Sequence, residues 1–368
     1  MFIVEHFNLI VEALTYYFNR VDEKQCTYLL RSYKERMPNN YEALAMDLEP
    51  IRQIEALLNR SVIVDESRME YFFHSFSNMS TGICGSCPAA LLFDASGESA
   101  SILQMEKGLS EYVRYLHYKT ESERVHDISM FFSAFIEDLS SIGTTINDLL
   151  ILIGKLPIST DDKWAVVDCI VNFDSYVDEL HAMLQPVVEI LGQNMELYSP
   201  LLNSVLQYLY SIPPDSIEQH FSDEYSMQIA PRSIGRIYPL LLAMNRLSVQ
   251  CSEYADEQVT VFIGVYFREM LALQQIQSNP NDISQAVKAI SDPKRLEILR
   301  SMRNEPQYGQ ELSERFGLTA TTTHYHLNRL LTTGLVSCNV DGYRSYYLMD
   351  TKSVSLLLDR IRHYLLED

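Results

Sequence analysis

The sequence predicts a mainly α-helical fold, in which a long helical N-terminal domain with one small β-hairpin precedes a short C-terminal domain of helices and a second hairpin. Apolar residues recur at three- and four-residue spacing through most of residues 1–283, the period of an amphipathic helix. Further along, short helical segments lead into two alternating strands. A polar stretch with a proline, residues 274–282, separates the two patterns. We therefore expect domains at residues 1–276 and 283–368, joined by a linker at 277–282.

The C-terminal domain is expected to begin its central part with a helix at Pro293–Arg303. Asp292 can accept hydrogen bonds from the free N–H groups of the first turn, and proline is favoured at the first helical position. A second helix, Gln310–Phe316, ends at Gly317, where glycine permits the left-handed conformation that closes many helices. The expected buried residues are Leu296, Ile298, Leu299 and Met302 in the first helix, and Leu312 and Phe316 in the second.

A third helix, Ala320–Leu331, is expected to have a buried side and a polar side. At about 100° per residue, the buried side carries Thr323, Leu327 and Leu330. The opposite side carries Thr321, Tyr325 and Asn328, flanked by His324, and Thr319 is expected to cap the helix. Hydroxyl, amide and imidazole groups can donate to phosphates and reach base edges in a major groove. The third helix is therefore predicted to contact DNA.

The chain then predicts a β-hairpin. Strands Leu335–Val340 and Tyr343–Leu348 flank Asp341-Gly342, a pair typical of a type I′ turn, and Arg344 lies near its tip. Short helices, a turn, a third helix and a hairpin in this order are typical of a winged helix-turn-helix. The candidate DNA-binding residues are Thr319, Thr321, Thr322, His324, Tyr325, Asn328 and Arg344.

Residues 289–302, 311–337 and 341–348 together resemble the DNA-binding domain of ArsR/SmtB-type transcriptional regulators. The resemblance covers roughly residues 283–368, just under a quarter of the chain. It implies that Thr319–Asn328 enters the major groove, that Tyr343–Arg344 forms the tip of the wing, and that the outer helices form a homodimer. Those helices would be Ile283–Ile290 and Ser353–Leu366. Helical spacing independently predicts an apolar stripe on the second of them, made of Val354, Leu357, Leu358, Ile361 and Leu365.

The same family includes metal sensors, so the resemblance raises the question of a metal site. One family site uses paired cysteines before the second helix, where residues 307–310 contain no thiol. Another uses Asp and His on the last helix. Asp350 and His363 match its spacing, but Lys352 and Leu366 occupy the remaining positions. Because two ligands do not complete a tetrahedral site, we expect no metal, and the sequence indicates no other cofactor.

Composition indicates a globular protein, with 368 residues, 47% hydrophobic and 21% charged. No apolar run approaches the length of a membrane span, the N-terminus lacks a basic leader, and the six cysteines are mostly isolated. We therefore expect a cytoplasmic protein without a membrane partner.

The net charge of −20 is distributed unevenly along the chain. From residue 283 onward there are 11 basic and 10 acidic residues, which leaves 18 basic and 39 acidic residues upstream. An acidic N-terminal domain would repel DNA away from the docking face and limit non-specific binding. Ordinary solubility explains the acidity equally well.

Most of the N-terminal domain carries helical periodicity without a chemical motif. The helix Glu66–Phe76 is rich in aromatic residues, for which a buried seam is the expected role. Pro186 is expected to kink or break the helix predicted over residues 174–190. Arg246–Cys251 and Gln258–Phe267 alternate apolar and polar residues, which predicts a β-hairpin.

Two features of this domain have a chemical and a structural interpretation. Cys84 and Cys87 form a closely spaced thiol pair before Pro88, as in redox sites. That chemistry usually follows a β-strand, whereas helix-like sequence precedes this pair, so a turn in which Pro88 opens a helix is the favoured interpretation. Asp161-Asp162 can be a paired-carboxylate site or a helix cap, and the cap is favoured because no complementary base or metal ligand follows.

Taken together, these patterns predict a transcriptional regulator and not an enzyme, since the sequence lacks the common nucleotide-binding and hydrolase motifs. It would bind double-stranded DNA as a homodimer through the third helix and wing. The N-terminal domain would sense an unidentified small molecule or protein, or contribute to dimerisation. The alternatives are a winged helix that serves as a protein-interaction module, and a thiol-redox-responsive protein acting through Cys84 and Cys87.

Overall fold

The computed structural model describes residues 1–36, 41–77, 86–93, 99–132, 145–225, 233–251, 258–268, 280–331, 333–341 and 344–366. The chain divides into two compact units. The first unit comprises residues 1–131, 142–211 and 234–268, and the second comprises 132–141, 212–233 and 269–368. This grouping differs from the sequence-based division, which placed residues 132–141, 212–233 and 269–276 in the N-terminal domain.

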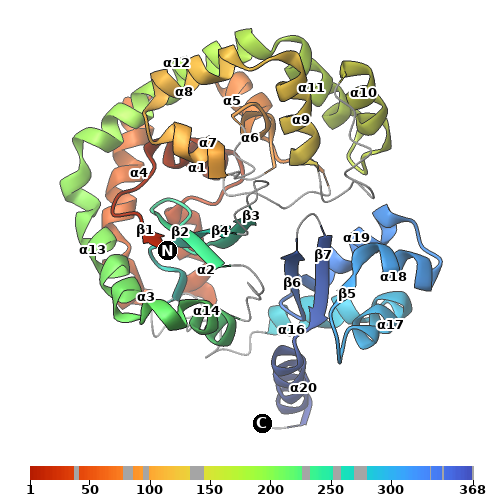
Figure 1. Ribbon diagram of the computed structural model, residues 1–368. Helices are drawn as coiled ribbons and strands as arrows, with labels where there is room; N and C mark the ends of the chain where they lie inside the picture. Colours follow the sequence, from red (N-terminus) through yellow and green to blue (C-terminus); the bar gives the residue numbers. More distant parts are fainter. Residues whose placement is uncertain are drawn as a thin grey trace. The chain divides into compact units, whose positions relative to one another are not determined.

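The first unit is mainly helical, as predicted, and its helices curve around a small β-sheet (Figure 1). The helices are α1 Leu9–Val21, α2 Cys26–Arg36, α3 Tyr41–Asp47, α4 Glu49–Ser61, α5 Glu66–Phe73, α6 Pro88–Leu92, α7 Ser99–Met105, α8 Leu109–Tyr118, α9 Glu121–Phe131, α10 Ile146–Lys155, α11 Thr160–Val171, α12 Phe173–Gln193 and α13 Met195–Ser211.

The sheet of the first unit has four strands in the order β1-β2-β4-β3. Its strands are β1 Phe2–Ile3, β2 Ser233–Leu240, β3 Leu247–Cys251 and β4 Gln258–Gly264. The predicted hairpin is confirmed, because β3 and β4 pair antiparallel with Val249 opposite Val261. Strands β1 and β2, which pair in parallel, were not predicted. β2 contains a glycine, an arginine and a proline, which hide its alternation.

Helix α12 continues for 21 residues through Pro186. Of the predicted kink or break, the break is therefore wrong. A proline inside a helix removes one backbone hydrogen bond. The cost is offset by burial on both sides of Pro186, where Leu184 and Val187 are fully buried. The aromatic seam of residues 66–76 is confirmed, since Phe72, Phe73 and Phe76 are at most 2% exposed.

The structural interpretations of the two ambiguous motifs gain support. Cys87 is fully buried and precedes α6, which begins at Pro88, while Cys84 lies outside the described residues. A buried thiol cannot exchange with partners in solution, so the structure offers no support for the redox alternative. Asp162 lies in the first turn of α11, after the cap Ser159, and accepts hydrogen bonds from the N–H and hydroxyl of Ser77 at 2.9 and 2.5 Å.

A buried carboxylate ties α1 to the segment that follows β2. Glu12 is 1% exposed and accepts hydrogen bonds from the backbone N–H groups of Leu241 and Leu242 at 2.8 and 2.7 Å. One side chain therefore satisfies two backbone donors just beyond the end of a strand. The Asn19 side chain, two turns further along α1, donates to the carbonyl of Leu242 at 2.9 Å.

The second unit has its core in the C-terminal domain. Its elements are a short 3₁₀ helix Pro214–Ser216, α14 Ile217–Tyr225, α16 Pro280–Ile290, α17 Pro293–Ser301, β5 Gln307–Tyr308, α18 Gly309–Phe316, α19 Ala320–Leu331, β6 Val336–Asp341, β7 Arg344–Met349 and α20 Thr351–Leu366. A three-stranded sheet has the order β5-β7-β6. Of the predicted linker, residues 277–279 lie outside the described residues and 280–282 form the first turn of α16.

The core of this domain joins every element from α16 to α20 except β5. It consists of Ala286, Ile298, Leu299, Met302, Leu312, Leu327, Leu330, Leu335, Val336, Tyr347 and Leu357. Leu296, which was expected in the core, is 51% exposed. It lies three residues before Leu299 and two before Ile298, and those two side chains already fill the buried side of α17.

The predicted hairpin is confirmed, but its turn was placed one residue too early. Asp341 pairs with Arg344 in the β6–β7 ladder, and Val340 pairs with Ser345. Asp341 therefore belongs to the strand and not to the turn, and residues 342–343 lie outside the described residues.

Candidate nucleic-acid interface

The approach to α19 is fixed by hydrogen bonds on both sides of a tight turn. Gly317 adopts a left-handed conformation with φ 62° at the end of α18, as predicted, and Leu318 donates its N–H to the Ser313 carbonyl at 2.9 Å. The Thr319 hydroxyl accepts from the N–H of Thr322 at 3.1 Å, which confirms Thr319 as the cap of α19. Helix α19 begins and ends where the sequence predicted, at Ala320–Leu331.

The inner side of α19 is buried, which fixes the rotation of the helix. Leu327 and Leu330 are at most 1% exposed, and the buried Thr323 hydroxyl accepts a hydrogen bond from Ser313 at 3.0 Å. This bond links α18 to α19 inside the turn. Because the inner side is fixed, the side chains on the opposite side have defined positions relative to the wing.

The opposite side of α19 is polar but less open than predicted. Tyr325 is 45% exposed, whereas Thr322, His324 and Asn328 are only partly exposed; the side chain of Thr321 lies outside the described residues. Burial lowers the pKa of His324, so near pH 7 its imidazole is mostly neutral. His324 can therefore share a hydrogen bond with a base or a phosphate but supplies little positive charge.

Two further residues of α19 were not considered in the prediction, and only the first of them lies on the polar side. Arg329 is exposed and lies one turn after Tyr325; its guanidinium carbon is 5.7 Å from the centre of the Tyr325 ring. The i, i+4 spacing from Tyr325 was the signal that places it on the polar side. His326 is 7% exposed, and burial lowers its pKa, so it belongs to the inner side of the helix.

The wing is held against the helical part of the domain by β5. Gln307 pairs with Tyr347 and Tyr308 pairs with Tyr346, and the rings of Tyr308 and Tyr346 are 5.7 Å apart. Arg344 is the first residue of β7, at the distal end of the ladder. Its backbone is thus at the tip of the wing, as predicted, while its side chain lies outside the described residues.

The predicted apolar stripe on α20 divides into two parts. Leu357 belongs to the domain core, and Val354 and Ile361 pack against it. Leu358 and Leu365 are 57% and 68% exposed. The exposed apolar residues of the outer helices, here called the outer-helix patch, are Val287, Leu358, Tyr364, Leu365 and Leu366.

Of the two positions considered for a metal on the last helix, Asp350 has a structural role. Asp350 caps α20, accepting from the N–H and the hydroxyl of Ser353, both at 3.0 Å. The side chain of His363 lies outside the described residues. Within the described part of the chain, no group of three or more His, Cys, Asp or Glu side chains is placed to hold a metal ion. Nor does any described helix have the length and apolar character needed to cross a membrane.

The capped helix α19, the helix α18 packed behind it and the β-ribbon wing together form a winged helix-turn-helix, the fold of many DNA-binding transcriptional regulators. The model of the family described as bacterial regulatory protein, arsR family, matches residues 292–337. The HTH-type transcriptional regulator YgaV of Escherichia coli (strain K12) is 30% identical over 95 residues, which cover 26% of this chain and 96% of YgaV. Through this C-terminal part, the chain belongs to the arsR family of bacterial regulatory proteins.

Two solved structures are each similar to about a quarter of the chain. Reduced HlyU from Vibrio cholerae N16961 is 24% identical, with 26% of this chain and 99% of HlyU covered and a TM-score of 0.21. The homodimeric winged helix-turn-helix DNA-binding domain of Mb0332 from Mycobacterium bovis is 23% identical, with 27% and 89% covered and a TM-score of 0.20. The matched family and YgaV are regulators of transcription and not enzymes.

Proposed function

We propose that this protein is a homodimeric regulator that binds an operator through α19 and the wing, and that its N-terminal unit senses an effector. The observation that carries the proposal is the two-sided character of α19. Its inner side is locked by Leu327, Leu330 and the Ser313–Thr323 hydrogen bond. Its outer side presents Tyr325 and Arg329 with the hydroxyl and amide groups around them, which suits a helix that enters a major groove.

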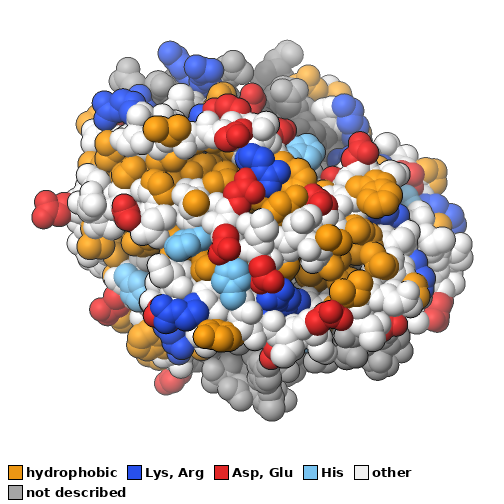
Figure 2. Space-filling view, turned by 90° about the horizontal axis from the view of Figure 1, so that it is seen from above, with side chains coloured by type: hydrophobic (Ala, Val, Ile, Leu, Met, Phe, Trp, Pro, Cys, Tyr) orange, Lys and Arg blue, Asp and Glu red, His pale blue; other side chains and the backbone are white. Residues whose placement is uncertain are grey.

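The charge distribution favours a specific site over general attraction to DNA. The C-terminal domain has almost equal numbers of basic and acidic residues, so base contacts must supply a large part of its affinity for an operator. On the face drawn in Figure 2, the described Asp and Glu side chains are scattered among basic and apolar ones instead of forming one acidic patch. This supports solubility as the role of the acidic residues on this face.

The assigned DNA contacts predict that some substitutions weaken binding to the operator alone and that others weaken binding to all DNA. Tyr325→Ala and Thr321→Ala should each weaken binding to the selected operator by roughly 1–3 kcal/mol while leaving binding to unrelated DNA almost unchanged, because the proposal assigns both residues to base edges. Arg344→Ala should weaken binding to all sequences alike and reduce the salt slope by about one, because it contacts phosphates. Fluorescence anisotropy at several salt concentrations measures both effects.

Arg300→Ala is the matched control for Arg344→Ala. Arg300 is exposed on α17, outside the recognition helix and the wing, so its replacement should change operator affinity little. Equal losses on operator and unrelated DNA for all the α19 variants would contradict base contact. If wild-type protein selected no sequence from a random duplex pool, and bound DNA only weakly at low salt, the interaction-module alternative would replace this proposal.

The outer-helix patch predicts the oligomeric state. Replacing Leu358 and Leu365 together by aspartate should convert a dimer into a monomer. Dimerisation of the variant would bury two carboxylates in the interface without a positively charged partner. Loss of one half-site should lower operator affinity by at least about tenfold. Light scattering after size-exclusion chromatography checks the mass. Leu296→Asp, at the exposed leucine of α17, is the control and should stay dimeric; a monomeric wild-type protein would refute the assignment.

A further inference from the structure

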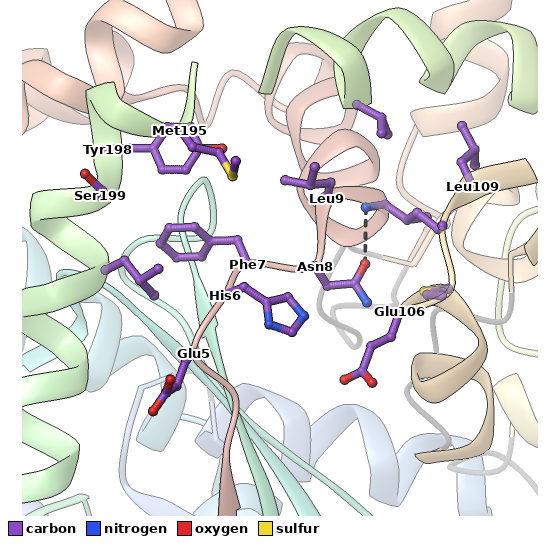
Figure 3. A pocket seen from close by; sticks show the side chains of 15 residues that line it. Glu5, His6, Phe7, Asn8, Leu9, Glu106, Leu109, Met195, Tyr198 and Ser199 are labelled. Atoms are coloured by element: carbon purple, nitrogen blue, oxygen red, sulfur yellow. Dashed lines mark hydrogen bonds between the residues drawn. The ribbon is translucent and has the colours of Figure 1, made fainter. Parts of the chain in front are cut away.

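The first unit contains a mostly apolar cavity of about 410 Å³, within the range of small-molecule sites in proteins. The start of α1, the connection between α7 and α8, and the facing parts of α12 and α13 line it (Figure 3). Phe7 and Tyr198 form one wall, with ring centres 5.6 Å apart. The Tyr198 hydroxyl donates to the Leu191 carbonyl at 2.7 Å, which leaves the face of its ring for apolar contact.

One buried polar group in this lining has no partner among the described residues. Asn8 is 6% exposed and caps α1, and its Oδ1 accepts from the N–H groups of Ile10 and Val11 at 3.2 and 3.3 Å. Both cap bonds need an acceptor, so the side-chain atom that receives them is the oxygen, and the remaining atom of the amide is the NH₂ nitrogen, Nδ2. This Nδ2 atom is buried, and no described group accepts a hydrogen bond from it. Figure 3 shows it turned away from α1, toward the side of the cavity where Glu106 lies.

An unsatisfied buried donor costs about 1–3 kcal/mol, and a ligand that carries a hydrogen-bond acceptor would recover part of that cost. The lining carries two carboxylates, Glu5 and Glu106, and one imidazole, His6, and the described lining residues include no lysine or arginine. Each carboxylate accepts a hydrogen bond from a tyrosine hydroxyl, Tyr210 for Glu5 and Tyr238 for Glu106. These bonds hold the negative charges beside the cavity, where they would attract a cation and repel an anion.

We infer that this cavity is a ligand site for a small, largely apolar molecule that carries a hydrogen-bond acceptor and, at one end, a positively charged group. The apolar body packs against Phe7, Leu109 and Tyr198. The acceptor receives the N–H of the Asn8 amide, and the cationic end lies beside Glu106, on the side toward which that amide is turned. Anionic molecules with the same body are rejected, because two fixed carboxylates repel them.

The position of the cavity also provides a route to the rest of the first unit. Asn8 begins α1, and Glu12, one turn later, binds the N–H groups of Leu241 and Leu242. The same segment binds the last residues of the unit, through Val265 N–H to Leu240 and Tyr266 N–H to Met244 at 2.9 and 2.8 Å. From there the chain continues toward α16. A ligand of the cavity would thus be an effector of the regulator proposed above. Only this link between ligand binding and regulation rests on the proposed function.

Three benzamides that share an N-propyl arm test the inference with the full-length protein. They end in an ammonium, a methyl or a carboxylate group, so the body and the carbonyl acceptor stay constant. Calorimetry without DNA should show the ammonium compound binding most tightly, the methyl compound at least about tenfold more weakly, and the carboxylate not at all. No binding of the ammonium compound at millimolar concentration would overturn the site, as would equal binding of all three.

Asn8→Asp provides the sharpest variant. Aspartate keeps an oxygen for the helix cap but removes the NH₂ donor, so folding should be retained while the preference for a carbonyl is lost. We compare the ammonium compound with an analogue in which CH₂ replaces C=O. The variant should bind these two compounds equally tightly. Wild-type protein should prefer the carbonyl compound by about tenfold. An unchanged preference in the variant would show that Asn8 does not contact the ligand.

Glu106→Gln should reduce the preference for ammonium over methyl, whereas Glu111→Gln, on the exposed side of α8, should not. A cavity-filling Leu202→Trp variant should abolish binding of all compounds, and unchanged binding would place the ligand elsewhere. Operator affinity is then measured with and without the ammonium compound. Absent compound binding with intact operator binding overturns the cavity assignment alone. Absent operator binding with intact compound binding overturns the proposed function alone.

Discussion

Replacing Glu12 by alanine is expected to lower the free energy of unfolding of the first unit by about 2–6 kcal/mol. The substitution leaves the buried N–H groups of Leu241 and Leu242 without acceptors, and each such donor costs about 1–3 kcal/mol. Thermal and denaturant unfolding followed by far-UV circular dichroism measure the change. Glu66→Ala is the control: its carboxylate is 68% exposed in a bridge to Arg20, so the loss should stay below about 1 kcal/mol.

Glu12 also predicts how stability depends on pH. Burial raises the pKa of Glu12 from its ordinary value of 4.5 to about 7, although the two backbone N–H groups oppose the shift. Between these values the folded chain keeps a proton that the unfolded chain releases. The free energy of unfolding should therefore fall as pH rises from about 4.5 to 7, by up to roughly 3 kcal/mol from this group, and then level off.

A second buried carboxylate contributes in the same direction. Burial raises the pKa of Glu55 to about 7, although the hydrogen bond that its carboxylate accepts from the N–H of Cys26 opposes the shift. Glu12→Gln should thus remove about half of the pH-dependent decrease and leave the part due to Glu55. An identical pH profile for the variant and the wild-type protein would show that Glu12 does not titrate in this range.

Replacing Gly264 by alanine is expected to be the most damaging single-methyl substitution, with a cost of about 3 kcal/mol or more. A Cβ at this position would lie 2.2 Å from the carbonyl oxygen of Met244 and 2.5 Å from that of Ala243. Both atoms belong to backbone, so a side-chain rotation cannot relieve the contact. The Met244 carbonyl would have to move away from the Tyr266 N–H, whose hydrogen bond it accepts, which weakens the end of β4.

Gly154→Ala is the matched control for this substitution. Gly154 lies inside α10, where an added Cβ would meet no described atom within 4 Å, and alanine favours a helix over glycine by up to about 1 kcal/mol. The control should therefore be neutral or slightly stabilising in the same unfolding experiment. A Gly264→Ala protein as stable as wild type would mean that residues 243–244 can shift freely, and the route from the cavity to Val265 and Tyr266 would lose its support.

The sequence by itself determined the local elements of the C-terminal domain. Asp292, Gly317 and Thr319 act within three to five residues of themselves, as caps and as a left-handed helix end, so their roles follow from short-range geometry. The 3.6-residue period likewise identified the inner side of α19. These signals depend only on neighbours in the chain.

Only the tertiary structure decided features in which distant segments meet. Strand β2 was missed because its pairing with β1 joins residues more than 230 positions apart, and its own alternation is weak. Pro186 stayed inside a helix because burial outweighed one lost hydrogen bond. The sequence did not predict the roles of Glu12 and Asn8 for the same reason. Tertiary packing decides whether a carboxylate or an amide is buried and whether it has a hydrogen-bond partner.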